Sequence, residues 1–298
     1  MSSTPTTTAP GVAGPAPLVA PIRTRARRRL PFPPGLAVAT VFFALIVLAA
    51  VVPSVYTHAD PNAGNAIDSL RAPSGAHLFG TDQNGRDVFS RVVHGAGPSL
   101  LIGVSASALA LVFGIVFGTL AAQGNKVLDA VVTRVLDVFL SIPGLLLALV
   151  LIAALGPSTR NSILGIAVIS TPGYARLVRG EVLRIRGSAF VEAATALGWS
   201  RPQAVVRHIV PNAIGPVIVL ATIGVGAAIS VGSGLSFLGL GPQPPTAEWG
   251  AMLSSSRDYL AVAWWPAIFP GIAITVTVLS VTVIGRHLQL RNEGRAVR

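Results

Sequence analysis

The sequence predicts an all-α integral membrane protein with six transmembrane helices. Of its 298 residues, 52% are hydrophobic and only 11% are charged, whereas about 25% of residues are charged in soluble domains. Six apolar stretches are each long enough to cross a bilayer, which takes about 20 helical residues. Because a chain in lipid must pair its backbone groups internally, we expect these stretches to be helices. The chain has no cysteine, which excludes disulfides and cysteine-ligated metals.

The predicted elements follow one another in a simple order. Residues 1–34 are rich in Thr, Ala and Pro and then in Arg, so we expect a disordered, basic cytoplasmic tail. The first transmembrane helix is predicted at 35–55. A basic run precedes it, as in a signal peptide, but no small-residue cleavage site follows before Pro53. An extracytoplasmic loop at 56–97, a five-helix core at 98–285 and a cytoplasmic tail at 286–298 complete the chain.

The five core helices correspond to apolar stretches at about 98–122, 129–155, 161–180, 213–237 and 266–285. Glycines such as Gly103 and Gly118 recur in them, and small residues let helices approach closely in lipid. Pro143 and Pro172 fall inside two stretches and predict bends, because proline removes a backbone hydrogen bond. The middles of the stretches carry almost no charge. Arg134 and Asp137, near the cytoplasmic end of the second, are one turn apart and are able to pair.

Basic residues are divided unevenly between the segments that join the predicted helices. With both termini in the cytoplasm, only Arg71, Arg86, Arg91, Arg160 and Arg257 of the 22 Lys and Arg residues fall outside. Cytoplasmic segments of membrane proteins carry the excess of basic residues, so this division predicts that both termini are inside. The net charge of +11 then follows from membrane topology, and no nucleic-acid partner is expected.

The segment 187–212 has the pattern of two short helices joined by a turn. Apolar residues recur at helical spacing in the first helix, at Phe190, Ala193, Ala194 and Leu197. Ser188 is placed to cap the start of this helix, and Gly198 is able to end it in a left-handed conformation. The segment therefore predicts a helix–turn–helix unit on the cytoplasmic surface.

The second helix of this segment is expected to start immediately after the turn. Ser200 and Gln203 have the spacing of a capping box, in which each side chain pairs with the backbone N–H of the other residue. Pro202 is tolerated in the first turn of a helix, whereas Pro211 predicts the end of this one.

The segment resembles the EAA loop of bacterial ABC-importer permeases. The match consists of Glu192-Ala193-Ala194, then Gly198, then His208-Ile209-Val210-Pro211-Asn212. The general pattern has Ile and Leu where this chain has His208 and Val210, but the histidine and the following Pro-Asn resemble the peptide-importer branch. The alternative is an ordinary amphipathic surface hairpin.

A second resemblance covers the external segments. His77-Leu78-Phe79-Gly80-Thr81-Asp82 and 85–91 resemble the signature of the inner-membrane permeases of dipeptide, oligopeptide and nickel importers, with Leu78 where Pro is usual. The segments 235–241, 244–246 and 249–250 resemble the last external loop of the same family, and 139–149 also matches. The resemblance departs after Gly285, where the family commonly has Asp and this chain has Arg286.

The resemblance implies a type I ABC-importer permease with a cytoplasmic coupling loop in the cell inner (cytoplasmic) membrane. Such a subunit has no ATPase site and carries peptides or, in the same family, nickel chelates or haem. The implied partners are a homologous second permease, two cytoplasmic ABC ATPases that bind ATP and Mg²⁺, an extracytoplasmic substrate-binding protein and membrane lipid. The residues implied in ATPase coupling are Phe190, Glu192, Ala193, Ala194, Leu197, Gly198, His208, Pro211 and Asn212. The residues of the extracytoplasmic motif are His77, Gly80, Thr81, Asp82, Gly85, Arg86 and Asp87.

The residues themselves limit the chemistry of the chain. No Gly-x-x-x-x-Gly-Lys-Ser/Thr is present, so no nucleotide is bound through a P-loop and the energy must come from another polypeptide. His58, His77 and His94 match no zinc spacing, and no metal is expected. Asp82 and Asp87 suit a catalytic carboxylate pair, but the adjacent arginine favours an ion-paired structural loop.

Two other classes of function need features that this sequence lacks. A self-sufficient secondary transporter or channel needs charges at mid-membrane or inverted repeats. A membrane-embedded enzyme needs paired carboxylates or a His–Asp set at one depth. The cargo is left open among dipeptides, longer peptides, nickel chelates and haem, because the binding protein largely sets selectivity.

Overall fold

The computed structural model describes residues 33–123, 126–189, 191, 198–200, 203 and 205–292, without the side chains of 206, 208 and 292. These residues belong to one unit, Phe32–Arg298. The predicted N-terminal tail lies outside them except for its last residues. Within them the regular structure is helical, and extended segments pair only at two isolated bridges, Gly64 with Arg86 and Thr81 with Asp87. The prediction of an all-helical membrane protein is confirmed.

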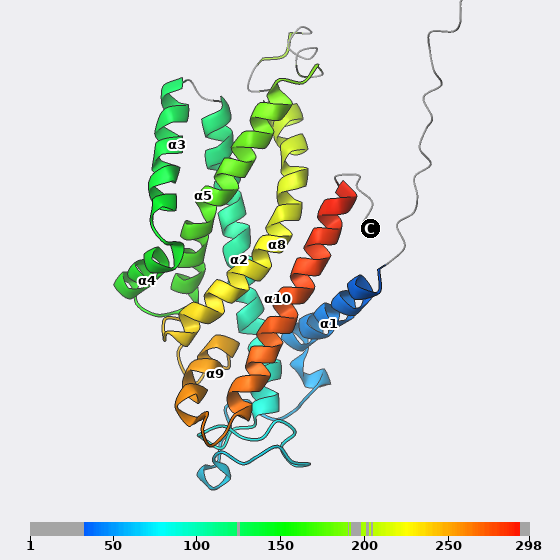
Figure 1. Cartoon of the computed structure of the whole chain (residues 1–298), viewed down its shortest axis with the longest axis vertical. Helices are drawn as coiled ribbons and strands as arrows, with labels where there is room; N and C mark the ends of the chain where they lie inside the picture. Colours follow the sequence, from blue (N-terminus) through cyan, green and yellow to red (C-terminus); the bar gives the residue numbers. More distant parts are fainter. Residues whose placement is uncertain are drawn as a thin grey trace, which may run out of the picture. The chain divides into compact units, whose positions relative to one another are not determined.

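The helices of the described residues pack as a bundle around α2. They are α1 (Pro34–Val51), α2 (Val88–Gln123), α3 (Lys126–Ser141), α4 (Gly144–Leu155), α5 (Thr159–Arg186), α8 (Val210–Phe237), α9 (Trp249–Ser256) and α10 (Trp265–Asn292). Short turns lie at η1 (Pro53–Val55), η2 (Ala66–Asp68) and η4 (Arg257–Tyr259), and a π-helix at η3 (Val205–Ile209). Figure 1 shows α5 and α8 beside α2, with α4 next to α5 and α1 next to α10.

Length and composition identify fewer membrane-crossing helices than the expected six. Within the described residues, α1, α2, α8 and α10 are the four helices long and apolar enough to cross a bilayer, and the bent pair α3 and α4 makes a fifth if it counts as one span. The second half of α5 carries Arg176, Arg179, Glu181, Arg184 and Arg186, which lower its hydropathy. Length and composition thus support four or five spans, and six are not confirmed.

The single span expected at 129–155 is broken in two. α3 ends at Ser141, α4 starts at Gly144, and the two are bent by 90°. Pro143 stands between them with an extended ψ of 118°, and a proline also disfavours the helical conformation of the preceding residue. The bend expected at this proline is therefore a complete break, whereas α5 continues through Pro172.

Three helix limits also differ from the sequence-based ones. α2 begins at Val88 rather than at residue 98, because its first turns bury the polar side chains of Ser90 and Arg91 against protein. α1 ends at Val51, before a short turn that starts with Pro53. α10 continues beyond the expected span to Asn292. Hydropathy predicts the apolar part of each helix but does not show how far the helix continues into polar sequence.

The glycines of α2 lie where neighbouring helices come closest. A β-carbon on Gly103 would collide with Ile229 of α8, and one on Gly118 would collide with Ala175 of α5. The expectation that small residues permit close helix packing is confirmed at these two positions.

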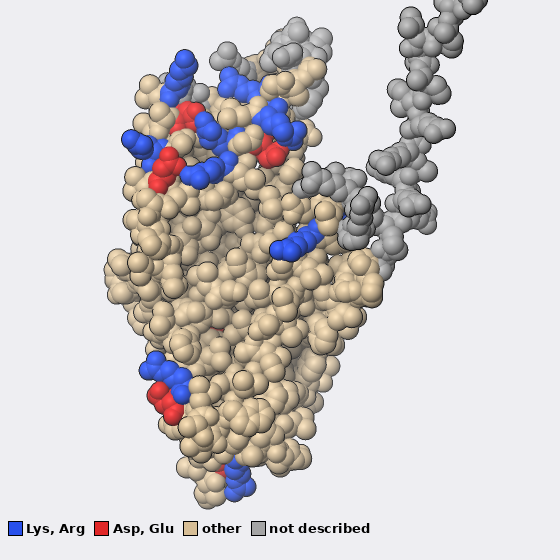
Figure 2. All heavy atoms as spheres, viewed as in Figure 1, with Lys and Arg blue, Asp and Glu red and all other residues tan. Residues whose placement is uncertain are grey.

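Charged side chains gather at the ends of the helices. Figure 2 shows most of those on the visible face near the end of α5 and the start of α3, with a broad band of uncharged surface next to them. A band of this kind is the surface that the hydrocarbon core of a bilayer covers.

Candidate functional site

The segment that joins α5 to α8 is the candidate site of ATPase coupling. Five of its predicted residues lie outside the described residues: Phe190, Glu192, Ala193, Ala194 and Leu197. The side chain of His208 lies outside them as well. At its start, the Ser188 hydroxyl donates to the carbonyl of Ile185 at 2.6 Å. This serine therefore satisfies a free carbonyl in the last turn of α5. Its expected role as a cap of the next helix falls on residues outside the described ones.

Gly198 has a positive φ of 88°, so the left-handed conformation predicted from the sequence is confirmed. Among the described residues, no heavy atom lies within 4 Å of the place that a β-carbon would take. The requirement for glycine is therefore conformational and not steric. Close by, the backbone N–H of Ser200 donates to Gln203 Oε1 at 3.1 Å, which is one half of the predicted capping box.

Pro211 does not end a helix, contrary to the prediction. The π-helix η3 runs directly into α8, and Pro211 lies in the first turn of α8. A proline breaks the hydrogen-bond ladder of a continuous helix, and the wider π-turn directly before it is a place where such a break is accommodated. Residues 205–212 are thus continuous with α8.

Both ends of the segment are held in one buried apolar cluster. Val191 and Ile209 pack together with Val182 of α5 and Val217 of α8, and each of the four is at most 5% exposed. Protein interiors are close-packed and transmit displacements. The segment is therefore mechanically connected to α5 and α8.

Ion pairs join α3 to the same end of α5. Arg179 donates from Nε and Nη2 to the two carboxylate oxygens of Asp129, at 2.7 Å each. Asp137 pairs with Arg176 of α5 at 2.8 Å and not with Arg134, the partner that helical spacing allowed. The bidentate pair is the stronger, because Arg176 and Asp137 are largely exposed to solvent.

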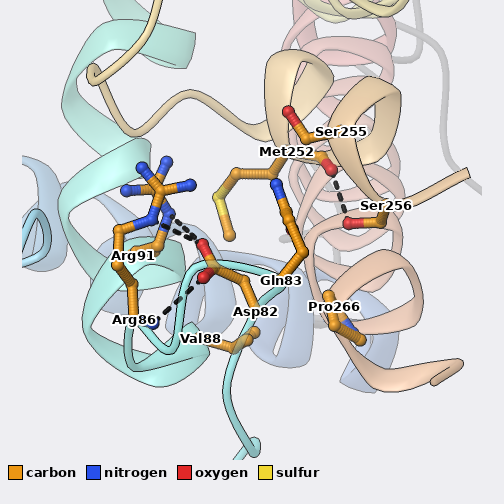
Figure 3. Close-up of a pocket in the computed structure, with 9 residues that line it drawn as sticks. All are labelled: Asp82, Gln83, Arg86, Val88, Arg91, Met252, Ser255, Ser256 and Pro266. Carbon is orange, nitrogen blue, oxygen red and sulfur yellow. Dashed lines mark hydrogen bonds and ion pairs between the residues drawn. The ribbon is translucent and has the colours of Figure 1, made fainter. Parts of the chain in front are cut away.

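The extracytoplasmic motif is organised around Asp82. Its Oδ1 accepts the backbone N–H groups of Asn84 at 2.8 Å and Arg86 at 3.0 Å, and its Oδ2 lies 2.7 Å from Arg86 Nε. Arg91 of α2 approaches the same Oδ2 at 3.5 Å (Figure 3). The expected ion-paired structural loop is confirmed for Asp82 and Arg86.

The second aspartate of the motif caps α2. Asp87 Oδ2 accepts the backbone N–H of Ser90 at 2.7 Å, and Oδ1 lies 3.0 Å from His77 Nδ1. The two aspartates thus have separate partners and do not form a carboxylate pair. Within the part of the chain that the structure describes, His58, His77 and His94 are not brought together, and no group of three potential metal ligands occurs.

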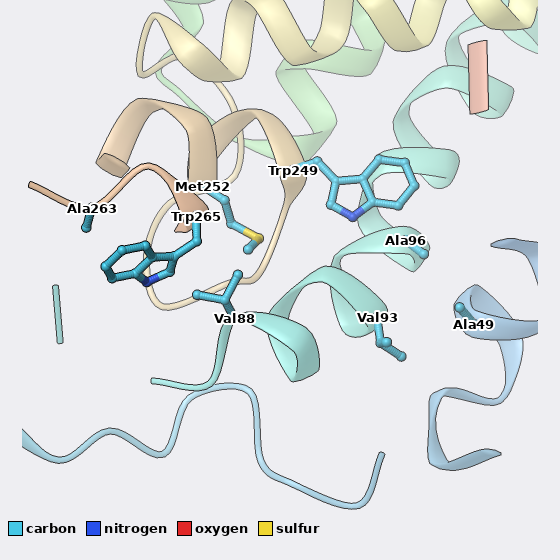
Figure 4. Close-up of a cluster of buried hydrophobic side chains, with 8 residues drawn as sticks. All are labelled: Ala49, Val88, Val93, Ala96, Trp249, Met252, Ala263 and Trp265. Carbon is cyan, nitrogen blue, oxygen red and sulfur yellow. The ribbon is translucent and has the colours of Figure 1, made fainter. Parts of the chain in front are cut away.

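Aromatic side chains hold the loop between α1 and α2 on the ends of the helices. Phe79 stacks on Phe269 of α10 with ring centroids 3.9 Å apart, and Trp265 Nε1 donates to the carbonyl of Thr81 at 3.0 Å. Figure 4 shows the buried cluster beside them, in which Trp249 and Trp265 lie with small side chains of α1 and α2. The motif is thus anchored to α10.

Glu248 is a buried residue that the sequence reasoning missed. Its side chain caps α9 by accepting the N–H groups of Gly250 at 3.0 Å and Ala251 at 2.9 Å, and it also accepts the hydroxyl of Ser99 of α2 at 3.0 Å. An acidic residue directly before a helix is the signal that identifies such a cap. The sequence resemblance instead places 249–250 in an external loop and predicts no helix there.

Several helices that are long and apolar enough to cross a bilayer define a multi-pass membrane protein. A family model described as "Binding-protein-dependent transport system inner membrane component" matches residues 114–294, and the chain belongs to this family. It is therefore an inner-membrane permease subunit of an ABC importer and not the ATPase.

Curated relatives match most of the chain. A dipeptide transport system permease protein, DppC, from Alkalihalophilus pseudofirmus is 40% identical over 86% of this chain and 83% of its own. A probable D,D-dipeptide transport system permease protein, DdpC, from Escherichia coli K12 is 41% identical over 83% of each chain. A glutathione transport system permease protein, GsiD, from an Escherichia coli O6:K15:H31 strain is 37% identical over 84% of this chain and 83% of its own.

Solved structures of amino-acid importers share the fold. The MetNI methionine ABC transporter in an inward facing conformation matches 67% of this chain and 95% of its own with a TM-score of 0.56 and 20% identity. An amino acid ABC transporter crystallised with histidines matches 67% of this chain and 94% of its own with a TM-score of 0.54 and 17% identity. At these identities the similarity establishes the fold alone.

Proposed function

We propose that this chain forms, with a homologous second permease, the translocation pathway of an ABC importer for peptides. The observation that carries the proposal is the shared cargo class of its relatives. Permeases named for dipeptides, D,D-dipeptides and glutathione are 37% to 41% identical to it over more than four fifths of its length. Nickel chelates and haem, the other cargoes implied by the family resemblance, are named in none of these three.

The proposed topology has six spans with both termini in the cytoplasm. It counts α3 and α4 as one broken span and includes α5, whose 28 residues reach about 42 Å at 1.5 Å per residue. The basic second half of α5 supports a cytoplasmic position for the segment 187–212, because cytoplasmic ends of spans are enriched in arginine. Figure 2 is consistent with this placement, since charge gathers at that end.

The proposed coupling site is the segment 187–212, including Glu192 and Asn212. Two ATPase subunits, which bind ATP and Mg²⁺, would dock on it, so that closure of the ATPases moves the attached helices. The buried cluster supports this role, because it contains residues from both ends of the segment and from α5 and α8. The positive φ of Gly198 supports a turn between its two halves.

A reconstituted complex tests the function directly. The chain, its second permease and two ATPases are placed in proteoliposomes, and the extracytoplasmic binding protein is added with radiolabelled dipeptide. We expect ATP-dependent accumulation of the peptide. Accumulation of a nickel chelate or haem without any peptide uptake would contradict the proposal.

A further inference from the structure

We propose that Trp199 and Arg207 are a positioning pair that fixes the turn of the coupling segment relative to α8. The Cζ atom of Arg207 lies 5.5 Å from the centre of the Trp199 ring, which is the geometry of a cation–π contact. The inference rests on the proposed function, because it takes docking of the ATPases on the segment 187–212 as given. It adds two residues that do not belong to the coupling set implied by the family resemblance.

The two residues lie at opposite ends of the second half of the segment. Trp199 directly follows Gly198, whose positive φ of 88° supports the turn. Arg207 lies further along the chain, in the π-helix η3. A contact between the two side chains therefore joins the turn to the helix that continues into α8. Without this contact, only the backbone between them links the direction of the turn to α8.

The helix that carries Arg207 is anchored in the interior of the bundle. Ile209, which ends η3, is 2% exposed and packs in one cluster with Val182 of α5 and Val217 of α8. η3 runs directly into α8, and Figure 1 shows α8 beside α5. Because close-packed residues have little freedom to shift, Arg207 gives Trp199 a fixed partner at the start of α8.

The chemistry of the two side chains suits a stacked contact. Arginine stays charged at every pH that a cell reaches, and its planar guanidinium group stacks on aromatic faces. Tryptophan has the ring that attracts a cation most strongly. Trp199 is partly buried and Arg207 is exposed, and among the described residues no ion pair includes Arg207. Replacing this arginine therefore breaks no described salt bridge.

The strength of such a contact suits the positioning of a turn and not the maintenance of the whole fold. At an exposed site a cation–π contact shifts an equilibrium about two- to fivefold. A shift of this size leaves a protein folded, because native structures outweigh unfolded ones by a far larger factor. It does change how often the turn has its docking direction. A preordered turn also reduces the entropy that the segment loses when an ATPase docks on it.

The test is peptide-stimulated ATP hydrolysis by the complete reconstituted complex, measured beside the amount of assembled permease. Trp199→Leu keeps an apolar side chain but removes the ring face, and Arg207→Gln removes the charge. We expect each variant to lower the stimulation about two- to fivefold. The double variant should lose no more than either single one, because both changes break the same contact. Trp199→Phe keeps an aromatic face and should retain most of the stimulation.

Arg184→Gln is the matched control for the loss of a positive charge. Arg184 lies in the last turn of α5, is exposed and pairs with Glu181 of its own helix. The control removes one charge near the start of the coupling segment without touching the stacked contact. We expect it to differ from wild type by less than about twofold.

Several outcomes contradict the positioning pair. The proposal is wrong if Trp199→Leu retains as much stimulation as Trp199→Phe or prevents assembly of the permease, or if the losses of the two single variants multiply in the double variant. A loss in Arg207→Gln without a loss in Trp199→Leu also contradicts it, because the arginine would then act on the ATPase directly. A wild-type complex that shows no peptide-stimulated hydrolysis would instead contradict the proposed function itself.

Discussion

Replacing Gly198 by a residue with a side chain should uncouple the permease from its ATPases. The glycine has a φ of 88°, and no described residue lies within 4 Å of a β-carbon there, so the cost considered is the strain of the left-handed backbone. That cost is about 1–2 kcal/mol for alanine, and it is larger for a β-branched residue. A change of 1–2 kcal/mol alters the population of the native turn about 5- to 30-fold.

The assay is peptide-stimulated ATP hydrolysis by the reconstituted complex, measured beside the amount of assembled permease. Gly198→Ala should lose part of the stimulation and Gly198→Val most of it. Both variants should insert and assemble normally, because the residue lies outside the membrane spans. The strained turn relaxes by tilting the second half of the segment away from its docking angle.

A matched control comes from Gly156, which follows α4. It has a φ of 90° with a ψ of 149°, and no described residue lies within 4 Å of a β-carbon there. Gly156→Val therefore imposes a backbone strain that only glycine escapes, in a turn that is not part of the coupling segment. The reasoning is refuted if Gly198→Val and Gly156→Val reduce stimulation equally, or if neither reduces it.

Three further predictions follow from the proposed function. Glu192→Lys should weaken ATPase recruitment by about 2 kcal/mol or more if the carboxylate meets a basic group in a desolvated groove; co-purification of the ATPases measures this, and full recruitment contradicts it. Reporter fusions at residues 29, 124 and 294 should report the cytoplasm, and fusions at Asn65 and Gly250 the outside; a cytoplasmic signal at Asn65 would overturn the six-span topology. The purified chain alone should hydrolyse no ATP, and hydrolysis that persists after removal of every contaminating ATPase is the opposing result.

Residues whose role depends on local conformation or on near neighbours were predictable from the sequence. The left-handed turn at Gly198 follows from glycine chemistry, and the pairing of Asp82 with Arg86 follows from adjacent opposite charges in a Gly-rich turn. The helical class follows from composition, because lipid leaves few alternatives for an apolar chain. These features need no knowledge of the tertiary fold.

Features that depend on distant partners could not be predicted in the same way. Asp137 pairs with Arg176, which is far away in the chain, instead of with the arginine one turn before it. Glu248 owes its burial to α2, and α2 starts early because its polar first turns meet the external loop. The local pattern predicts that Pro211 ends a helix, but it follows the π-helix directly and lies in the first turn of α8.

The π-helix at Val205–Ile209 has a consequence for the phase of the helix that follows it. A π-turn holds one residue more than an α-turn, and each residue of an α-helix advances the side-chain direction by about 100°. Side chains of α8 are therefore rotated by about that angle relative to an uninterrupted helix that starts in the coupling segment. This offset changes the direction in which the apolar residues of α8 face, and deletion of a single residue within the π-helix would turn them back by the same angle.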